Sequence, residues 1–252
     1  MATVGQEKSV LDNHKMQIYL LYQTDWLATG SGYDDKIGAL WVNPSTCKPV
    51  GSTIGHEIGH SFQYQVSADK LFTGEVTPID RADGSQLVPA GFRYGFGENG
   101  AGGCAYWEQC AQWQSFQDYP NECFDQDAHY AVWLKNHHRH FNHEFMRYAS
   151  YWFQYWFTEK HGIESYARIW KESKYPEDPL QTYMRIYCNN SLDALYKDLY
   201  EYSAHCADYD FKAVHQYKKE AAINYSTKLY KNDGYYQVAY TNCPGTTGFN
   251  LI

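Results

Sequence analysis

The sequence predicts an α+β protein in which a small N-terminal β-sheet packs on one long helix, followed by a mainly helical part. Three observations lead to this class. Strand-type segments occupy residues 15–23 and 37–42, a helix-type segment begins near residue 52, and helix-type segments separated by Gly and Pro follow from about residue 104. The 252 residues are enough to bury a substantial core as one large domain.

The two predicted strands differ from the rest of the chain in their side chains. Residues 15–23 (KMQIYLLYQ) and 37–42 (IGALWV) are rich in β-branched, aromatic and aliphatic residues. Both precede the first long helix, so we expect the sheet to pack against that helix.

The first helix is expected over residues 52–66, with Ser52 or Thr53 as its N-cap. Ile54 and Ile58 fall on the side opposite the histidines of this segment, which predicts one face in a core and the other at a site.

Two glycines interrupt this helix, and each costs about 1 kcal/mol of helix stability relative to Ala. Gly55 and Gly59 are therefore expected where a neighbouring backbone or a bound substrate approaches closely.

The remainder alternates between loop and helix signals. Residues 67–103 form a long polar segment that we expect to border a cleft. The helices expected after it are residues 104–118, 124–137, 142–160, 163–173, 179–187, 191–206 and 211–223. Residues 235–240 read again as a strand. We therefore divide the chain into a domain of residues 1–225 and a C-terminal strand segment, 226–252, which would begin a following β domain.

His56-Glu57-Ile58-Gly59-His60 has the pattern HExxH. Residues four apart lie on one face of a helix, so two imidazoles at this spacing can bind one metal ion, with the carboxylate of Glu57 beside the open coordination position. The alternative is an amphipathic helix with two surface histidines and a charge.

A catalytic zinc normally takes three protein ligands and a water. A third His six residues after His60 is excluded, because Val66 stands there. The candidates further along the chain are Glu75, Glu98, Glu108 and His129.

Glu108 is the best candidate for the third ligand. It lies in residues 105–117, a helix-type segment rich in Trp, Ala and Cys, where a carboxylate is costly unless it is paired or binds a metal. Glu75 and Glu98 lie in polar segments where solvated carboxylates are ordinary. A helix-surface position is the alternative for Glu108, and His129 is better read as a supporting or structural residue.

Gly55–Gln65, together with Trp107–Trp113, resembles gluzincin-type metallopeptidases, which take two His from an HExxH helix and a Glu from a second helix downstream. The closest likeness is to an uncharacterised bacterial family classed as secreted peptidases, which has a segment similar to Leu40–Pro44. The enhancin-like, mucin-targeting metallopeptidases are more distantly similar. The sequence departs from the pattern at Gln112, where some gluzincins carry an Asp that orients a zinc-bound His.

The resemblance implies a zincin-like metallopeptidase domain over residues 1–225. His56, His60 and Glu108 would bind Zn²⁺, and the zinc would lower the pKa of a bound water and polarise the scissile carbonyl. Glu57 would accept the proton of that water and deliver it to the leaving amine. The substrate would be a protein or glycoprotein. The alternatives are a non-catalytic glycan- or protein-binding module and a zinc hydrolase acting on a non-peptide amide.

Composition limits the other function classes. A net charge of −8 without a Lys/Arg stripe argues against nucleic acid, and no apolar run reaches the roughly 20 residues of a membrane span. Met1–Val4 lacks the apolar region of a secretory leader, so only the resemblance implies a secreted, periplasmic or cell-surface protein. The seven cysteines form no C-x-x-C pair, and a Cys188–Cys206 disulfide is one of several options.

Two further segments have competing interpretations. The histidine-rich residues 136–143 fit a solvated helix end, with a second metal site or a transition-state donor as the alternative. Aromatic residues recur at helical spacing in residues 148–156, which favours a buried helix face over a glycan-binding cleft.

Overall fold

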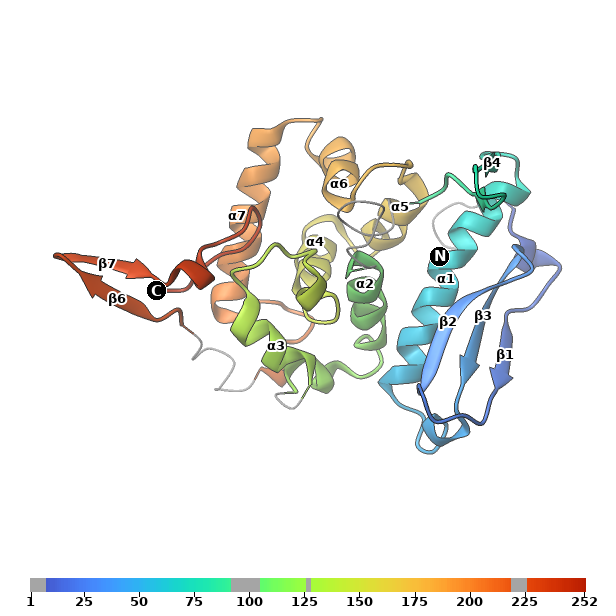
Figure 1. Cartoon of the computed structure of the whole chain (residues 1–252), viewed down its shortest axis with the longest axis horizontal. Coiled ribbons are helices and arrows are strands. Elements are labelled where there is room, and N and C mark those ends of the chain that lie inside the picture. The colour runs from blue at the N-terminus through green and yellow to red at the C-terminus, as the bar shows by residue number, and fades with distance from the viewer. Residues whose placement is uncertain (1–7, 92–104, 126–127, 219–225) are drawn as a thin grey trace.

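The computed structural model describes residues 8–91, 105–125, 128–218 and 226–252. It has the predicted α+β architecture (Figure 1). A small sheet lies at one end of the molecule, helix α1 (Ser52–Phe72) packs on it, and the remaining helices lie on the other side of α1.

The sheet has three strands in the order β1-β3-β2. β3 (Ile37–Val42) is the central strand, as its apolar sequence requires, and it is parallel to β1 (Gln17–Leu20) and antiparallel to β2 (Ala28–Tyr33). The predicted strand at 37–42 is confirmed, and that at 15–23 is shortened at both ends. β2 was not predicted and forms the edge next to α1.

β2 was missed because its sequence, ATGSGY, carries two glycines in place of the usual strand residues. The fold requires one of them: a Cβ on Gly30 would collide with the main-chain oxygen of Glu57 in α1. β2 can therefore pack against α1 only through a residue without a side chain.

α1 differs from its prediction at both ends. Its N-cap is Gly51, with no capping hydrogen bond from a side chain, so the expected cap at Ser52 or Thr53 is wrong. Glycine is among the residues favoured at the N-cap. The helix runs six residues beyond Val66, where a hydrogen bond from the Gln65 amide to Asp69 links two buried polar residues (2.8 Å). Ile54 and Ile58 are only half-buried.

The other helices lie close to five of the predicted segments: α2 (Ala105–Ser115), α3 (His129–Asn136), α5 (Glu164–Glu172), α6 (Pro179–Tyr187) and α7 (Leu192–Asp208). Residues 142–160 are not one helix: a 3-10 turn at Glu144–Met146 precedes α4 (Trp152–His161). His143 causes this break, since its ring accepts a hydrogen bond from the Phe145 amide. Residues 211–218 contain a 3-10 turn at His215–Tyr217 instead of the expected helix.

The predicted aromatic core is confirmed with one exception. Four residues of the 148–156 segment are almost fully buried: Tyr151, Trp152, Tyr155 and Trp156. They join other large aromatic side chains in the core between α2, α4 and α7. Tyr148 is only half-buried and does not join this core.

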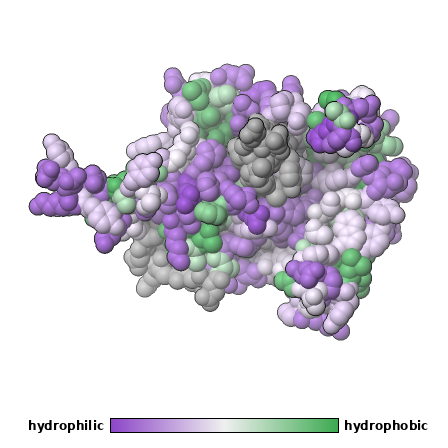
Figure 2. Space-filling view, viewed as in Figure 1, coloured by the Kyte–Doolittle hydropathy of each residue, from purple (hydrophilic) through white to green (hydrophobic). Residues whose placement is uncertain are grey.

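The C-terminal residues form two parts. β6 (Leu229–Asn232) and β7 (Tyr235–Val238) make a hairpin that projects away from the sheet end of the molecule, and its surface is mostly hydrophilic (Figures 1 and 2). Residues 245–249 then return to the body, where the amides of Gly245 and Phe249 donate to the main-chain oxygens of His138 and His137. The following β domain stays a prediction.

Residues 73–91 hold a short hairpin, β4 (Ile79–Asp80) with β5 (Gln86–Leu87).

The six cysteines of the described ranges are free thiols, so the Cys188–Cys206 disulfide is wrong. Among the helices that the structure describes, none has the length and apolar character needed to cross a membrane.

Candidate metal centre

The contact between α1 and α2 brings the two halves of the predicted site together. A Cβ on Gly59 would lie 3.0 Å from the Cα of Ala111, and one on Gly55 would lie 3.3 Å from the Cα of Ser115. Both glycines of α1 therefore face the backbone of α2, which confirms the close approach that the sequence predicted.

At this contact the side chains of His56, His60 and Glu108 converge. The Nε2 atoms of the two histidines lie 3.0 Å apart, and Oε2 of Glu108 lies 3.0 Å from Nε2 of His56 and 3.1 Å from Nε2 of His60. Within the described residues, this is the one group of His, Cys, Asp or Glu side chains with the geometry to hold a metal ion.

The cluster is largely buried, and burial raises the energy of its charged groups. Glu108 is 9% exposed. Burial opposes its ionisation, but hydrogen bonds to His56 and His60 outweigh that effect and hold the pKa of the carboxyl well below its usual range. Burial also disfavours the charged form of His60, yet the hydrogen bond and the charge of Glu108 raise the pKa of the ring above its ordinary value. Glu108 thus stays ionised, and its negative charge favours a cation beside it.

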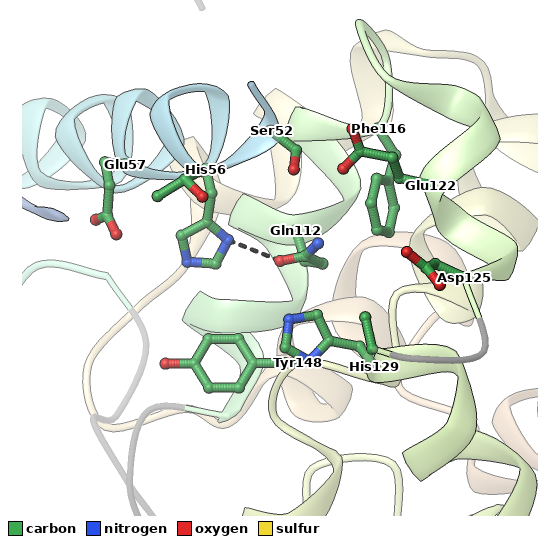
Figure 3. Close-up of a pocket in the computed structure, with 11 residues that line it drawn as sticks. Ser52, His56, Glu57, Gln112, Phe116, Glu122, Asp125, His129 and Tyr148 are labelled. Atoms are coloured by element: carbon green, nitrogen blue, oxygen red, sulfur yellow. Dashed lines mark hydrogen bonds between the residues drawn. The ribbon is translucent and has the colours of Figure 1, made fainter. Parts of the chain in front are cut away.

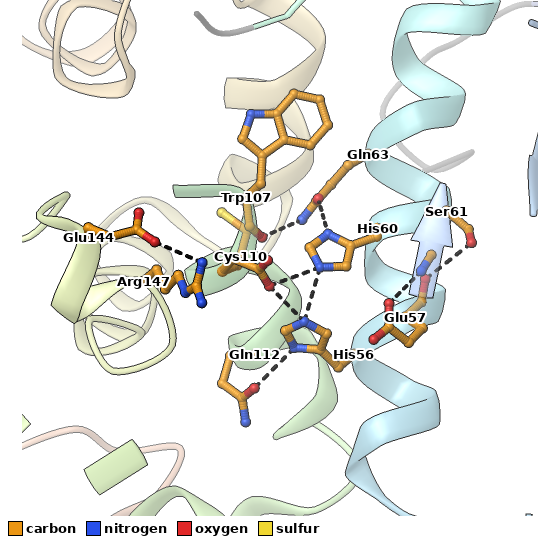
Figure 4. Close-up of polar contacts among 12 residues, drawn as sticks. His56, Glu57, His60, Ser61, Gln63, Trp107, Cys110, Gln112, Glu144 and Arg147 are labelled. Atoms are coloured by element: carbon orange, nitrogen blue, oxygen red, sulfur yellow. Dashed lines mark hydrogen bonds and ion pairs between the residues drawn. The ribbon is translucent and has the colours of Figure 1, made fainter. Parts of the chain in front are cut away.

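Two glutamine side chains orient the imidazoles (Figure 4). The side-chain oxygen of Gln112 lies 3.0 Å from Nδ1 of His56, and that of Gln63 lies 2.9 Å from Nδ1 of His60. An amide oxygen only accepts, so each Nδ1 carries a proton and each Nε2 is the nitrogen that faces Glu108. Gln112 thus makes a contact of the kind that the resemblance assigns to an Asp.

The three side chains fit a metal ion. Two imidazole nitrogens, which bind a metal once Nε2 has lost its proton, and one carboxylate oxygen, each held by its neighbours, form a donor set suited to zinc. His56, His60 and Glu108 are the residues that would hold it.

Glu57 lies beside this cluster and does not join it. One oxygen of its buried carboxylate accepts a hydrogen bond from the main-chain N–H of Gly30 in β2 (Figure 4). Glu57 is thus fixed by the edge strand of the sheet, with its carboxylate lining the cavity next to His56.

Tyr148 is the functional candidate that the sequence did not single out. Its ring lies 5.8 Å from that of His56 and stacks on His129 at 5.0 Å (Figure 3). The guanidinium of Arg147 lies 5.0 Å from the centre of the Tyr148 ring. Its spacing from the aromatic residues that follow predicts a place on the same buried helix face. In the structure, Tyr148 instead lies between the 3-10 turn and α4.

Two adjoining cavities open at the centre, and both are lined by His56, Glu57 and Tyr148. The first extends past His129 and Gln112, with a volume of about 280 Å³ (Figure 3). The second, of about 410 Å³, runs along β2 between Ala28 and Ser31. Residues 67–91 line neither of these two cavities, and residues 92–103 lie outside the described residues, so the expectation that the segment 67–103 borders the cleft stays a prediction.

The remaining candidates lie elsewhere. Glu75 is an exposed residue near Lys70, at the far end of α1 from His56, and Glu98 lies outside the described residues. His129 lines the first cavity without joining the cluster, consistent with its predicted supporting role. His137 and His138 are buried under the returning C-terminal residues, so this part of the histidine-rich segment is structural, not a solvated helix end.

Residues 2–252 match a family described as "Family of unknown function (DUF6055)". The chain belongs to this family. No curated protein and no solved structure matches the chain. Since the description of DUF6055 assigns no activity, a function for this member has to be argued from its own residues.

Proposed function

We propose that this DUF6055 protein is a zinc-dependent endopeptidase with Glu57 as its general base. The observation that carries the proposal is the convergence of three ligand atoms, one from each of His56, His60 and Glu108, at 3.0 to 3.1 Å from one another. Bringing a carboxylate to one buried and one partly buried imidazole costs desolvation energy, which binding of a cation offsets.

When bound, zinc supplies a Lewis acid and lowers the pKa of a water to near neutrality. Glu57 follows His56 in α1 and lines both cavities, and its carboxylate is held by the Gly30 amide. Its carboxylate accepts the proton of the attacking water and then delivers it to the leaving amine. The hydrogen bond to β2 keeps the carboxylate in place while the proton moves.

Tyr148 is the residue suited to stabilise the negative charge that develops on the scissile carbonyl oxygen. It lines both cavities, and its ring is held by stacking on His129. A phenol in this position donates a hydrogen bond to the developing oxyanion.

The edge strand favours a peptide over another amide. Among the described residues, β2 has a sheet neighbour on one side only, and Ala28–Ser31 line the second cavity. An extended peptide can add to such an edge through main-chain hydrogen bonds, which a small non-peptide amide cannot do. A protein or glycoprotein chain is therefore the proposed substrate.

A binding module on the same fold is the competing function. Glu57 separates the two, because a module without chemistry has no need for a buried carboxylate beside the cluster. Zinc retained for structure alone would also need no cavity next to the ligands.

The experiment that tests the proposal is metal analysis of the purified protein by mass spectrometry beside its Glu108→Ala and Glu75→Ala variants. The wild type and Glu75→Ala should each contain about one zinc per chain. Glu108→Ala should lose it. Retention of zinc in Glu108→Ala would show that Glu108 is not a ligand and would contradict the proposed site. Zinc bound without any cleavage of a proteome-derived peptide library would favour the binding module.

A further inference from the structure

The cavity that runs from His56 toward residues 122–129 has an acidic far end. Figure 3 shows His56 and Glu57 at one side of it and the carboxylates of Glu122 and Asp125 at the other. No lysine or arginine is among the described residues that line it. The cavity is therefore negatively charged over a volume of about 280 Å³.

Two of its polar groups lack a protein partner within the described ranges. The carboxylate of half-buried Glu122 makes no hydrogen bond or ion pair. Gln112 is only 8% exposed, and its amide nitrogen also has no partner, while its oxygen contacts His56. Both groups line the cavity. A carboxylate and an amide nitrogen that have no protein partner there can accept from and donate to a ligand in the cavity.

The wall between the two ends is partly apolar. The ring of Phe116 and the methyl group of Ala128 line the cavity beside Gln112 and Glu122. An aliphatic stem fits such a wall while its charged head reaches a carboxylate, which is how lysine and arginine side chains divide between apolar and polar surroundings.

From these observations we propose that this cavity is a specificity pocket for a cationic group of the substrate, an amine or guanidinium on an aliphatic stem, with Glu122 as its principal partner. The amide nitrogen of Gln112 would donate to a carbonyl oxygen of the same substrate residue. This rests on the proposed function, because it names the substrate class of the same site.

The test measures binding of three small amides to the zinc-loaded full chain, followed by NMR of the His129 ring signals. Nα-acetyl-lysine methylamide carries a side-chain cation, norleucine methylamide carries only an α-ammonium, and Nα-acetyl-norleucine methylamide carries no charge. We expect at least one cationic probe to have a dissociation constant about fivefold lower than that of the neutral probe.

Variants assign this preference to the pocket. Glu122→Gln should abolish the difference, and the matched control Glu75→Gln, which lies outside the cavity, should retain it. Preference for the lysine probe identifies a basic side chain as the group selected, and preference for norleucine methylamide identifies a free amino terminus. Equal binding of all three probes, or a preference that survives Glu122→Gln, would overturn the proposal.

Binding of these probes requires no turnover, so an absence of peptidase activity leaves the test intact. Where peptides are cleaved, the ratio of kcat/KM for a lysine peptide to that for its norleucine analogue should fall about fivefold in Glu122→Gln. An unchanged ratio would contradict the pocket while leaving the peptidase function in place.

Discussion

The side-chain oxygen of Gln63 lies 2.9 Å from Nδ1 of His60, and the amide nitrogen of the same side chain donates to the main-chain oxygen of Trp107, also at 2.9 Å. The second bond fixes which end of the amide faces the imidazole. Gln63 thereby orients the ring of His60, a candidate ligand on α1. The same side chain is held by α2, the helix that carries Glu108.

Gln63→Leu should weaken zinc binding by about 10- to 100-fold, because the His60 ring loses the acceptor that orients it. The dissociation constant can be measured by competition with a chromophoric chelator. Gln117→Leu is a matched control, since Gln117 also donates to a main-chain oxygen, that of Trp113, but contacts neither histidine. Unchanged zinc affinity in Gln63→Leu would show that the His60 ring is oriented without it.

Glu57→Gln should lower kcat by about 10² to 10⁴ while leaving one zinc per chain, since the amide can still contact Gly30 but cannot accept the proton. Cleavage rates and metal content measured on the same sample test both parts. Full activity in this variant would end the proposed role of Glu57, and loss of zinc would instead make Glu57 a ligand.

Tyr148→Phe should lower kcat by about 10²-fold with little change in KM or zinc content, because it removes the hydroxyl but keeps the ring that stacks on His129. Steady-state kinetics on a cleaved peptide provides the measurement. A rise in KM at constant kcat would assign Tyr148 to substrate binding instead.

Gly59→Ala should destabilise the protein by about 1 to 2 kcal/mol, because the added methyl meets the Ala111 backbone at 3.0 Å and overpacking outweighs the gain in helix propensity. The free energy of unfolding in urea, with a chelator present, measures this effect. Gly55→Ala, with its nearest contact at 3.3 Å, should be closer to neutral. Equal or greater stability of Gly59→Ala would contradict the tight contact between the helices.

His137 should make stability depend on pH. Burial lowers the pKa of its ring from the ordinary 6.5 to about 4. Between these values the unfolded chain binds a proton that the folded protein does not, so stability is retained above pH 6.5 and lost as the pH falls toward 4. The loss from this group is about 2 kcal/mol at pH 5.

His137→Phe should remove that part of the acid sensitivity, since the ring packs beside Trp133 and Phe249 and a phenyl group preserves much of this contact. Urea unfolding at pH 7.5 and pH 5.0, with a chelator present, compares the two proteins. If both lose the same stability on acidification, His137 is not the group responsible.

Local sequence was enough to predict much of the fold. The apolar run at 37–42 and the spacing of residues 52–60 predicted β3 and α1, because strand and helix periodicities are properties of neighbouring residues. The sequence did not predict β2, where a glycine is needed because the strand packs closely against the backbone of Glu57. It also did not predict the break at His143, which arises from a side-chain contact to the backbone.

For the site, the sequence by itself determined the HExxH pair and favoured Glu108 over the other acids, because two turns of one helix fix the first two groups and an apolar helix makes a carboxylate costly. Only the tertiary structure shows which residues from distant segments meet at the site. The packing of α2 against two glycines of α1 brings Glu108 to the histidines, and the turn before α4 brings Tyr148 to the same cavity. Contacts between residues far apart in sequence depend on how whole elements pack, and no local pattern encodes that.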